Sequence, residues 1–180
     1  MNIFLIGFRG TGKSFIGKIL AQRLNRKYID ADEYLEQKEG KTIKDIFAES
    51  GEETFREIES RVIAELCMQN NLIVATGGGV VLNAENVGRM KKCGVAILLE
   101  ADADTLFERI KGDVGTKTKR PSLTQYDGYQ EIKYLLEKRK PSYGKAADFV
   151  VNTAQISADE TVNKIMSFIE NYVKDTKDEL

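Results

Sequence analysis

The chain has 180 residues, 42% of them hydrophobic and 31% charged, which suits one domain with a full core. Its 27 Lys and Arg against 28 Asp and Glu leave a net charge of −1, so charge gives no reason to expect nucleic-acid or membrane binding. The absence of histidine excludes Ser-His-Asp triads and histidine-ligated zinc. No apolar run is long enough to span a bilayer. The two cysteines are interpreted as reduced thiols, which indicates a cytoplasmic protein.

The first predicted elements enclose a glycine-rich motif. The apolar run at 3–6 predicts a buried strand, and residues 13–24 have the apolar spacing of a helix. Between them stands Gly7-Phe8-Arg9-Gly10-Thr11-Gly12-Lys13-Ser14, which matches the phosphate-binding loop G-x-x-x-x-G-K-[ST]. Backbone N–H groups and the helix N-terminus would hold phosphates, with Lys13 reaching the β- and γ-phosphates and Ser14 binding Mg²⁺. The motif predicts a nucleoside triphosphate site, and a glycine-rich turn that binds nothing is the alternative.

The second strand-like run ends in Asp30-Ala31-Asp32. If the chain stays extended there, both carboxylates point to one side. One could then help to hold hydrated Mg²⁺ while the other accepts hydrogen bonds from substrate hydroxyls. The alternative is a helix N-cap followed by a solvated acid.

A helical insertion over residues 32–68 follows, and its second helix opens with Thr42 and Asp45, close to a capping box. Further along, Arg56 and Glu59 are three residues apart and share a helix face. A surface ion pair is the ordinary explanation. The functional one makes Glu59 a brace that orients Arg56 toward an anionic substrate group, because the arginine fork binds a carboxylate bidentately.

The third strand-like run is followed by Gly77-Gly78-Gly79. Three successive glycines cost conformational entropy, so we expect a ligand that lies against this backbone rather than a plain turn. Residues 112–126 are basic, glycine-hinged and poor in apolar side chains, which in a nucleotide-binding chain favours a closing lid over a plain surface loop. Arg120 of this segment, Arg56 and Arg139 could all converge above the strand ends.

The other predicted elements complete an alternation of strands and helices. This alternation predicts a parallel sheet with helices on both faces, whose ligands gather at the carboxyl ends of the strands. The further strands are expected at 27–30, 72–75, 95–99 and 148–151, and the further helices at 52–68, 84–91, 103–111, 129–139 and 158–173.

Taken together, these residues resemble the shikimate kinase family, from Met1 to about Ala158. The likeness rests on the phosphate-binding loop, Tyr28 to Asp32, Ile46-Phe47, Gly51-Glu52 with Phe55-Arg56 and Glu59, the triple glycine, Arg120-Pro121, and Arg139-x-Pro141-x-Tyr143.

The resemblance implies ATP-dependent phosphorylation of the shikimate 3-hydroxyl in aromatic amino-acid biosynthesis. It also implies an α/β P-loop kinase fold, with a five-stranded parallel sheet in the order 2-3-1-4-5 flanked by helices. A single domain over residues 1–180 would include a substrate-binding insertion over about 32–61 and a lid over about 112–126.

By that likeness, the site residues divide according to their ligand. Shikimate would be bound by Asp32, Phe47, Phe55, Arg56, Glu59, Gly77, Gly78, Gly79 and Arg139. ATP would be bound by Gly10, Thr11, Gly12, Lys13, Ser14, Phe15, Arg109, Arg120 and Thr153, and Mg²⁺ by Ser14 and, through water, Asp30. Lys13 and Arg120 would neutralise the transferring phosphoryl group, and Asp32 would bind or deprotonate the attacking hydroxyl.

The chain departs from the family pattern at three positions. Phe15, Asn152 and Ala158 stand where the family usually has Thr, Asp and often Pro.

Three alternative functions remain open at this point. A gluconate kinase on the same fold would also bind a polyhydroxylated carboxylate, and a nucleoside monophosphate kinase would need a second base pocket. A catalytically silent nucleotide-binding protein is expected to lose Lys13, Asp32 or a substrate arginine. We expect a monomer that uses ATP, Mg²⁺ and shikimate.

Overall fold

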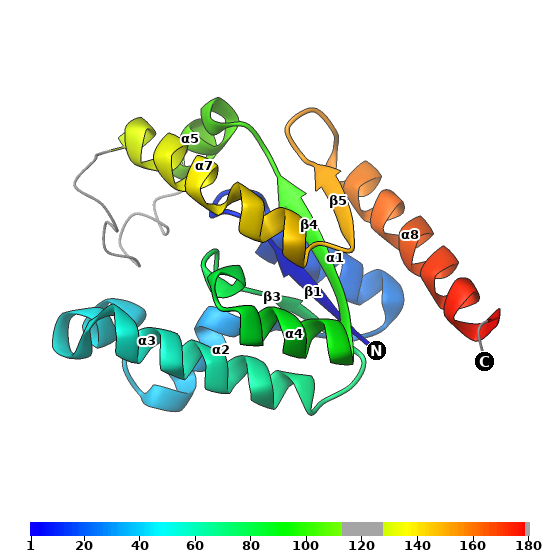
Figure 1. The fold of residues 1–180 in the computed structure, drawn as a ribbon. Helices are drawn as coiled ribbons and strands as arrows, with labels where there is room; N and C mark the ends of the chain where they lie inside the picture. Colours follow the sequence, from blue (N-terminus) through cyan, green and yellow to red (C-terminus); the bar gives the residue numbers. More distant parts are fainter. Residues whose placement is uncertain (113–127, 179–180) are drawn as a thin grey trace.

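The structure, a computed structural model, describes residues 1–112 and 128–178. Five parallel strands form one sheet in the order β2-β3-β1-β4-β5 (Figure 1). The predicted fold class and strand order are therefore confirmed. The expected lid lies outside the described residues, apart from Gly112, and so does Arg120. The strands are β1 (Asn2–Ile6), β2 (Lys27–Asp30), β3 (Leu72–Ala75), β4 (Gly94–Glu100) and β5 (Phe149–Asn152).

Helices cover both faces of the sheet (Figure 1). Helices α1 and α8 pack on one face, and α2, α3, α4 and the end of α7 pack on the other. The helices are α1 (Lys13–Leu24), α2 (Ala31–Glu39), α3 (Ile43–Cys67), α4 (Ala84–Cys93), α5 (Ala103–Gly112), α7 (Gly128–Ala146) and α8 (Ala158–Asp178), with a short 3-10 turn η1 (Val80–Leu82).

Central strand β1 supplies both cores. Ile3 and Leu5 pack with α1 and α8, whereas Phe4 and Ile6 pack with the helices of the opposite face. Because both faces of a parallel sheet are buried, its inner strands consist of continuous apolar runs. This packing brings the end of β1 to the middle of the sheet edge, and the phosphate-binding loop begins there.

Helices α4, α5 and α8 end one to five residues later than predicted, and α3 and α7 differ more from their predicted bounds. Helix α3 begins at Ile43, capped by Thr42, and continues through Gly51, whose φ of 81° and ψ of 176° are not helical. Helix α7 runs past the predicted end at residue 139, with Pro141 inside it, as far as Ala146. Proline normally ends a helix, but the last turn of α7 buries Tyr143 and Ala146 in the core.

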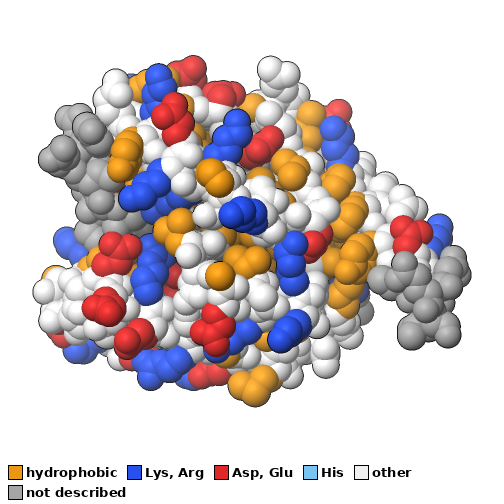
Figure 2. Space-filling view, viewed as in Figure 1, with side chains coloured by type: hydrophobic (Ala, Val, Ile, Leu, Met, Phe, Trp, Pro, Cys, Tyr) orange, Lys and Arg blue, Asp and Glu red, His pale blue; other side chains and the backbone are white. Residues whose placement is uncertain are grey.

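The surface agrees with the near-zero net charge. Figure 2 shows acidic and basic side chains interspersed over the described part of one face. Among the described helices, none is both long and apolar enough to cross a membrane.

Candidate active site

The phosphate-binding loop joins β1 to α1 at the sheet edge. Lys13 Nζ folds back over the loop and donates to the carbonyl oxygens of Gly7 and Phe8, each at 2.8 Å. Thr11 Oγ1 donates to the Phe8 carbonyl at 2.8 Å. Gly10 and Gly12 have φ angles of 82° and 91°, which favour glycine. This arrangement places a lysine ammonium and the α1 N-terminus on one concave backbone turn, as a polyphosphate requires.

Asp30 links this loop to the second strand. Ser14 Oγ donates to Asp30 Oδ2 at 2.8 Å, and the Tyr28 hydroxyl donates to the same oxygen at 3.2 Å. The other oxygen, Oδ1, caps α2 by accepting from Asp32 N at 3.1 Å. The hydroxyl of Ser14 and the carboxylate of Asp30 are hard oxygen donors, so the pair fits Mg²⁺ held jointly with phosphate oxygens.

The expected extended course of Asp30-Ala31-Asp32 is wrong. Asp30 is the N-cap of α2, and Asp32 lies in its first turn. Asp30 accepts capping hydrogen bonds from the first turn of α2, so the helix begins at Ala31 and residues 30–32 do not form an extended segment with alternating side chains. Asp32 is therefore held in the first turn of α2 by its bond to Asp30, and it is not part of the pocket lining given below.

One pocket opens between the phosphate-binding loop, α3, the triple glycine and α7. It combines aromatic walls with arginines from three segments. Phe47 and Phe55 form a tilted ring pair with centroids 4.7 Å apart. The lining residues are Phe8, Arg9, Ile43, Phe47, Phe55, Arg56, Gly78, Gly79, Leu135 and Arg139. Six of these are residues to which the family resemblance assigned substrate binding.

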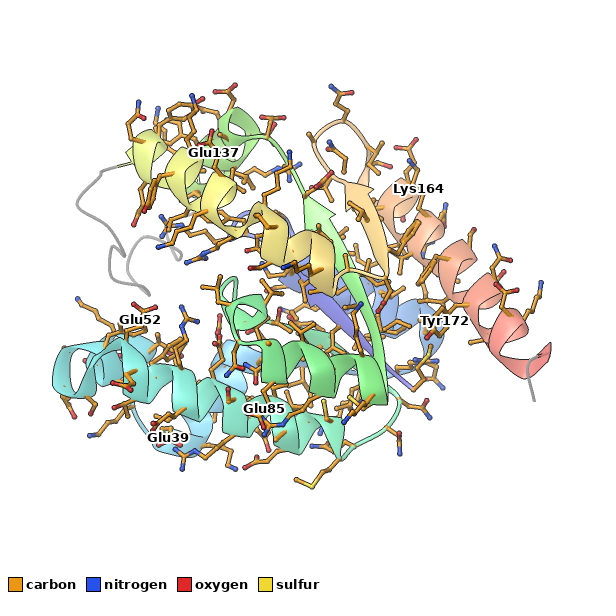
Figure 3. All side chains as sticks on the ribbon, in the orientation of Figure 1. Glu39, Glu52, Glu85, Glu137, Lys164 and Tyr172 are labelled. Atoms are coloured by element: carbon orange, nitrogen blue, oxygen red, sulfur yellow. The ribbon has the colours of Figure 1, made fainter. Side chains whose placement is uncertain are left out.

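Arg56 is held between two carboxylates of its own helix. Its Nη1 lies 2.8 Å from Glu59 Oε2, and its Nη2 lies 3.0 Å from Glu52 Oε1. Figure 3 shows Glu52 on the side of α3 that faces α7. Burial alone would lower the pKa of Arg56, but Glu59 and Glu52 together raise it. Arg56 therefore keeps its charge in the pocket, as the recognition of an anion requires.

The partner of Arg56 in this pair, Glu59, is only 5% exposed, so its charge is penalised by burial. Burial raises the pKa of its carboxyl, and the charges of Arg56 and Arg139 offset the rise only in part. Its second oxygen, Oε1, has no hydrogen-bond partner in the described part of the chain. The predicted pairing of Arg56 with Glu59 is thus present, and Glu59 is buried rather than exposed as in an ordinary surface ion pair.

Arg139 enters the pocket from α7 and is 6% exposed. Its Nη1 donates to the Gly78 carbonyl at 3.2 Å, and its guanidinium lies 5.7 Å from the centre of the Phe8 ring. A Cβ atom at Gly79 would overlap the guanidinium of Arg56. Gly79 therefore lets Arg56 approach the backbone closely, whereas a Cβ at Gly78 would lie 3.7 Å from Arg139 Nη1 in ordinary contact.

Arg109 and Thr153 meet on the other side of the loop. Arg109 Nη2 donates to the Thr153 carbonyl at 2.7 Å, and Nη1 donates to its hydroxyl at 3.1 Å. Thr153 Oγ1 donates in turn to the Thr11 carbonyl at 3.3 Å. The structure thus brings two predicted nucleotide-binding residues together against the loop, whereas Phe15 is 64% exposed on the first turn of α1.

Sequence reasoning missed part of the pocket. Phe8 and Arg9 occupy unspecified positions of the glycine motif, and no local pattern marks Leu135. Arg9 Nη2 pairs with the nearly buried Glu131 Oε2 at 2.8 Å, which ties the loop to α7. Only the helical spacing of Glu131, Leu135 and Arg139 on α7 could have indicated that they share one face.

The described residues include no group of three His, Cys, Asp or Glu side chains that could hold a metal ion by themselves. A cation at Ser14 and Asp30 would therefore rely on phosphate oxygens and water for its remaining ligands.

The family model and the curated relatives that match this chain all belong to one family. A family model described as shikimate kinase matches residues 9–170. A shikimate kinase of Persephonella marina is 44% identical over 168 residues, which cover 93% of this chain and 98% of that protein. A shikimate kinase of Thermodesulfovibrio yellowstonii is 42% identical over 169 residues, which cover 94% and 95%.

Solved structures agree. The shikimate kinase from Acinetobacter baumannii in complex with shikimate superposes with a TM-score of 0.87 at 33% identity, covering 95% of this chain and 93% of that one. A gluconokinase from Sinorhizobium meliloti 1021 has a TM-score of 0.65 at 14% identity, covering 99% and 96%. That second likeness concerns the fold alone.

Proposed function

Because the chain belongs to the shikimate kinase family and phosphorylates shikimate with ATP at its 3-hydroxyl, a step of aromatic amino-acid biosynthesis, we propose that the pocket between α3 and α7 holds the shikimate. The observation that carries the proposal is the meeting of Arg56 and Arg139, from two helices, over the Gly78–Gly79 backbone. Two guanidinium groups suit a carboxylate, and the backbone N–H groups suit hydroxyls. Phe47 and Phe55 would wall the ring.

The donor side lies next to this pocket. The backbone from Gly10 to Ser14 would hold the ATP phosphates, and Lys13 would leave the loop carbonyls to neutralise charge on the transferring group. Arg109 and Thr153 would border the adenine. Arg120, which lies outside the described residues, would add a second cation from the lid and complete the electrostatic stabilisation.

Mg²⁺ fits the pair Ser14 and Asp30, with Asp30 acting through water. When bound there, the ion neutralises phosphate charge during transfer. Asp32, at the start of α2, would bind or deprotonate the 3-hydroxyl. Phosphoryl transfer depends mainly on positioning and charge neutralisation, so this set of residues is sufficient without histidine.

We also propose that residues 1–180 form a single domain that works as a cytoplasmic monomer. Within it, residues of about 32–61 would form the substrate-binding segment, and those of about 112–126 the lid. The free cysteines Cys67 and Cys93 are consistent with a reducing compartment. Light scattering after size-exclusion chromatography tests the monomer, for which 20.2 kDa is expected.

The decisive test is ADP release with shikimate, gluconate or quinate as the acceptor. We expect rapid release with shikimate only, because gluconate lacks the ring that Phe47 and Phe55 would enclose, and quinate carries an extra hydroxyl beside its carboxylate. Equal turnover of gluconate would contradict the assignment of the pocket.

A further inference from the structure

Tyr143 lies on the last turn of α7 and is 5% exposed. Its hydroxyl donates to the carbonyl oxygen of Gly78 at 2.6 Å, at the short end of the range for O–H···O bonds. The same carbonyl oxygen accepts from Arg139 Nη1 at 3.2 Å. Two side chains one helical turn apart therefore grip a single oxygen of the triple glycine.

That oxygen controls the direction of the next amide. The peptide bond between Gly78 and Gly79 is trans, so its C=O and N–H groups point in opposite directions. Glycine residues have the widest choice of φ and ψ, and a Gly-Gly peptide can rotate at little steric cost. Fixing the Gly78 carbonyl on α7 therefore also fixes the direction of the N–H of Gly79, a pocket-lining residue at which an added Cβ would meet Arg56.

The two donors to Gly78 differ in their other duties. Arg139 lines the pocket and, under the proposed function, must also face the shikimate carboxylate. Tyr143 is not among the lining residues and belongs to the core cluster on that face of the sheet. Its hydroxyl can thus hold the Gly78 carbonyl in place while Arg139 engages the substrate.

We propose that Tyr143 is a positioning residue for shikimate, whose hydroxyl holds the Gly78–Gly79 peptide in its substrate-binding orientation. This proposal rests on the proposed function, because it requires that shikimate binds in this pocket. It concerns the acceptor side, and the phosphate-binding loop has its own internal hydrogen bonds from Lys13 and Thr11.

The test is Tyr143→Phe, which removes one oxygen and leaves the buried ring to pack. The matched control is Tyr34→Phe on α2, where the hydroxyl donates to Glu65 Oε2 at 3.3 Å, outside the pocket lining. Tyr143→Phe removes the bond to the Gly78 carbonyl, and Tyr34→Phe removes the bond to Glu65. We expect Tyr143→Phe to raise the KM and the calorimetric Kd for shikimate about five- to tenfold, as the loss of one buried hydrogen bond implies. The KM for ATP should stay within about twofold, and Tyr34→Phe should change neither substrate.

Two results would overturn the proposal. One is a Tyr143→Phe enzyme with the shikimate KM and Kd of the unchanged protein. The other is a variant that loses affinity for ATP and shikimate equally together with a lower melting temperature, because that indicates general loosening. The proposed function fails separately: if Arg56→Ala left shikimate affinity unchanged, the pocket itself would be misassigned, whatever Tyr143→Phe does.

Discussion

At the scale of single residues, Arg56 and its neighbour Glu59 can be tested by removing the arginine. Arg56→Ala should weaken shikimate binding by about 2–5 kcal/mol, because a charged, oriented contact is lost and the Glu59 carboxylate is left buried without its partner. Calorimetry with shikimate and, separately, with ADP measures the effect. ADP affinity should be preserved. Arg61→Ala is the matched control, since Arg61 lies on the same helix, is exposed and is 3.7 Å from Glu39.

Glu59 itself should make stability depend on pH. Burial raises its pKa in the folded protein above the usual 4.5, so at pH values between the unfolded and the folded pKa the native state holds a proton that the unfolded chain has released. The stability contributed by this group is full below that usual value and is lost as the pH rises through the folded pKa. The side chain in Glu59→Gln does not titrate. The unfolding free energy of the variant minus that of the unchanged protein should therefore increase as the pH rises from about 4 to 8.

Urea unfolding at successive pH values measures this difference. Glu57→Gln, at an exposed position on the same helix, is the control and should run parallel to the unchanged protein. Parallel curves for Glu59→Gln as well would show that burial of Glu59 does not penalise its charge.

The residue scale also shows what could be predicted from the sequence. The spacing of Arg56 and Glu59 was enough to predict their contact, because residues three apart on a helix are neighbours. It could not distinguish a brace from a surface pair, since burial depends on α7 and the triple glycine packing above α3. For Asp30 and Asp32 the local pattern fitted both a strand and a helix start. In the structure the residues start a helix, because the Asp30 side chain caps α2.

At the scale of elements, the interruption of α3 has a function in the geometry of the pocket. Phe47 precedes Gly51 and Phe55 follows it, yet both rings line the same pocket, with centroids 4.7 Å apart. A φ of 81° with a ψ of 176° is a conformation that essentially only glycine adopts. Gly51 therefore sets the angle at which the two parts of the helix present their aromatic side chains.

Gly51→Ala should accordingly destabilise the fold by about 1–3 kcal/mol through backbone strain. No described atom lies within 4 Å of the added Cβ, so a steric clash does not contribute. Gly88→Ala in α4 is a control of opposite sign: its Cβ also meets nothing within 4 Å, its φ is not in the left-handed region, and alanine in a helix gains about 0.5–1 kcal/mol. Thermal unfolding of the two variants compares them, and equal shifts would contradict the role of Gly51.

At the scale of the whole molecule, the alternation of apolar strands and amphipathic helices was sufficient to predict a parallel α/β sheet. Continuous apolar runs such as Phe4–Ile6 indicate a strand that is buried on both faces, and such a run can be recognised in the local sequence. The order of the strands came only from the family resemblance, because neighbouring strands are far apart in the sequence: β1 pairs with both β3 and β4. The missed contact of Arg9 with Glu131 has the same cause.

Both proposed substrate sites lie at the edge of this one sheet, so ligands should stabilise the whole fold. At a free concentration of about 100 times its Kd, a ligand adds about 2.7 kcal/mol to the unfolding free energy. For a chain of 180 residues each kcal/mol corresponds to about 2–4 °C, so shikimate should raise the melting temperature by about 5–10 °C. Gluconate at the same concentration should cause no shift.

The Arg56→Ala protein separates the two sites in the same experiment. If Arg56 acts only on the acceptor, the variant should lose the melting-temperature shift with shikimate and keep the full shift with MgADP. The reason is that the two ion pairs of Arg56 join it to Glu52 and Glu59 of its own helix and not to the phosphate-binding loop. Loss of both shifts would mean that the two halves of the site unfold together when one arginine is removed. The position of β1 between the two cores, with the loop at its end, argues for independent shifts, since neither core loses a packed side chain.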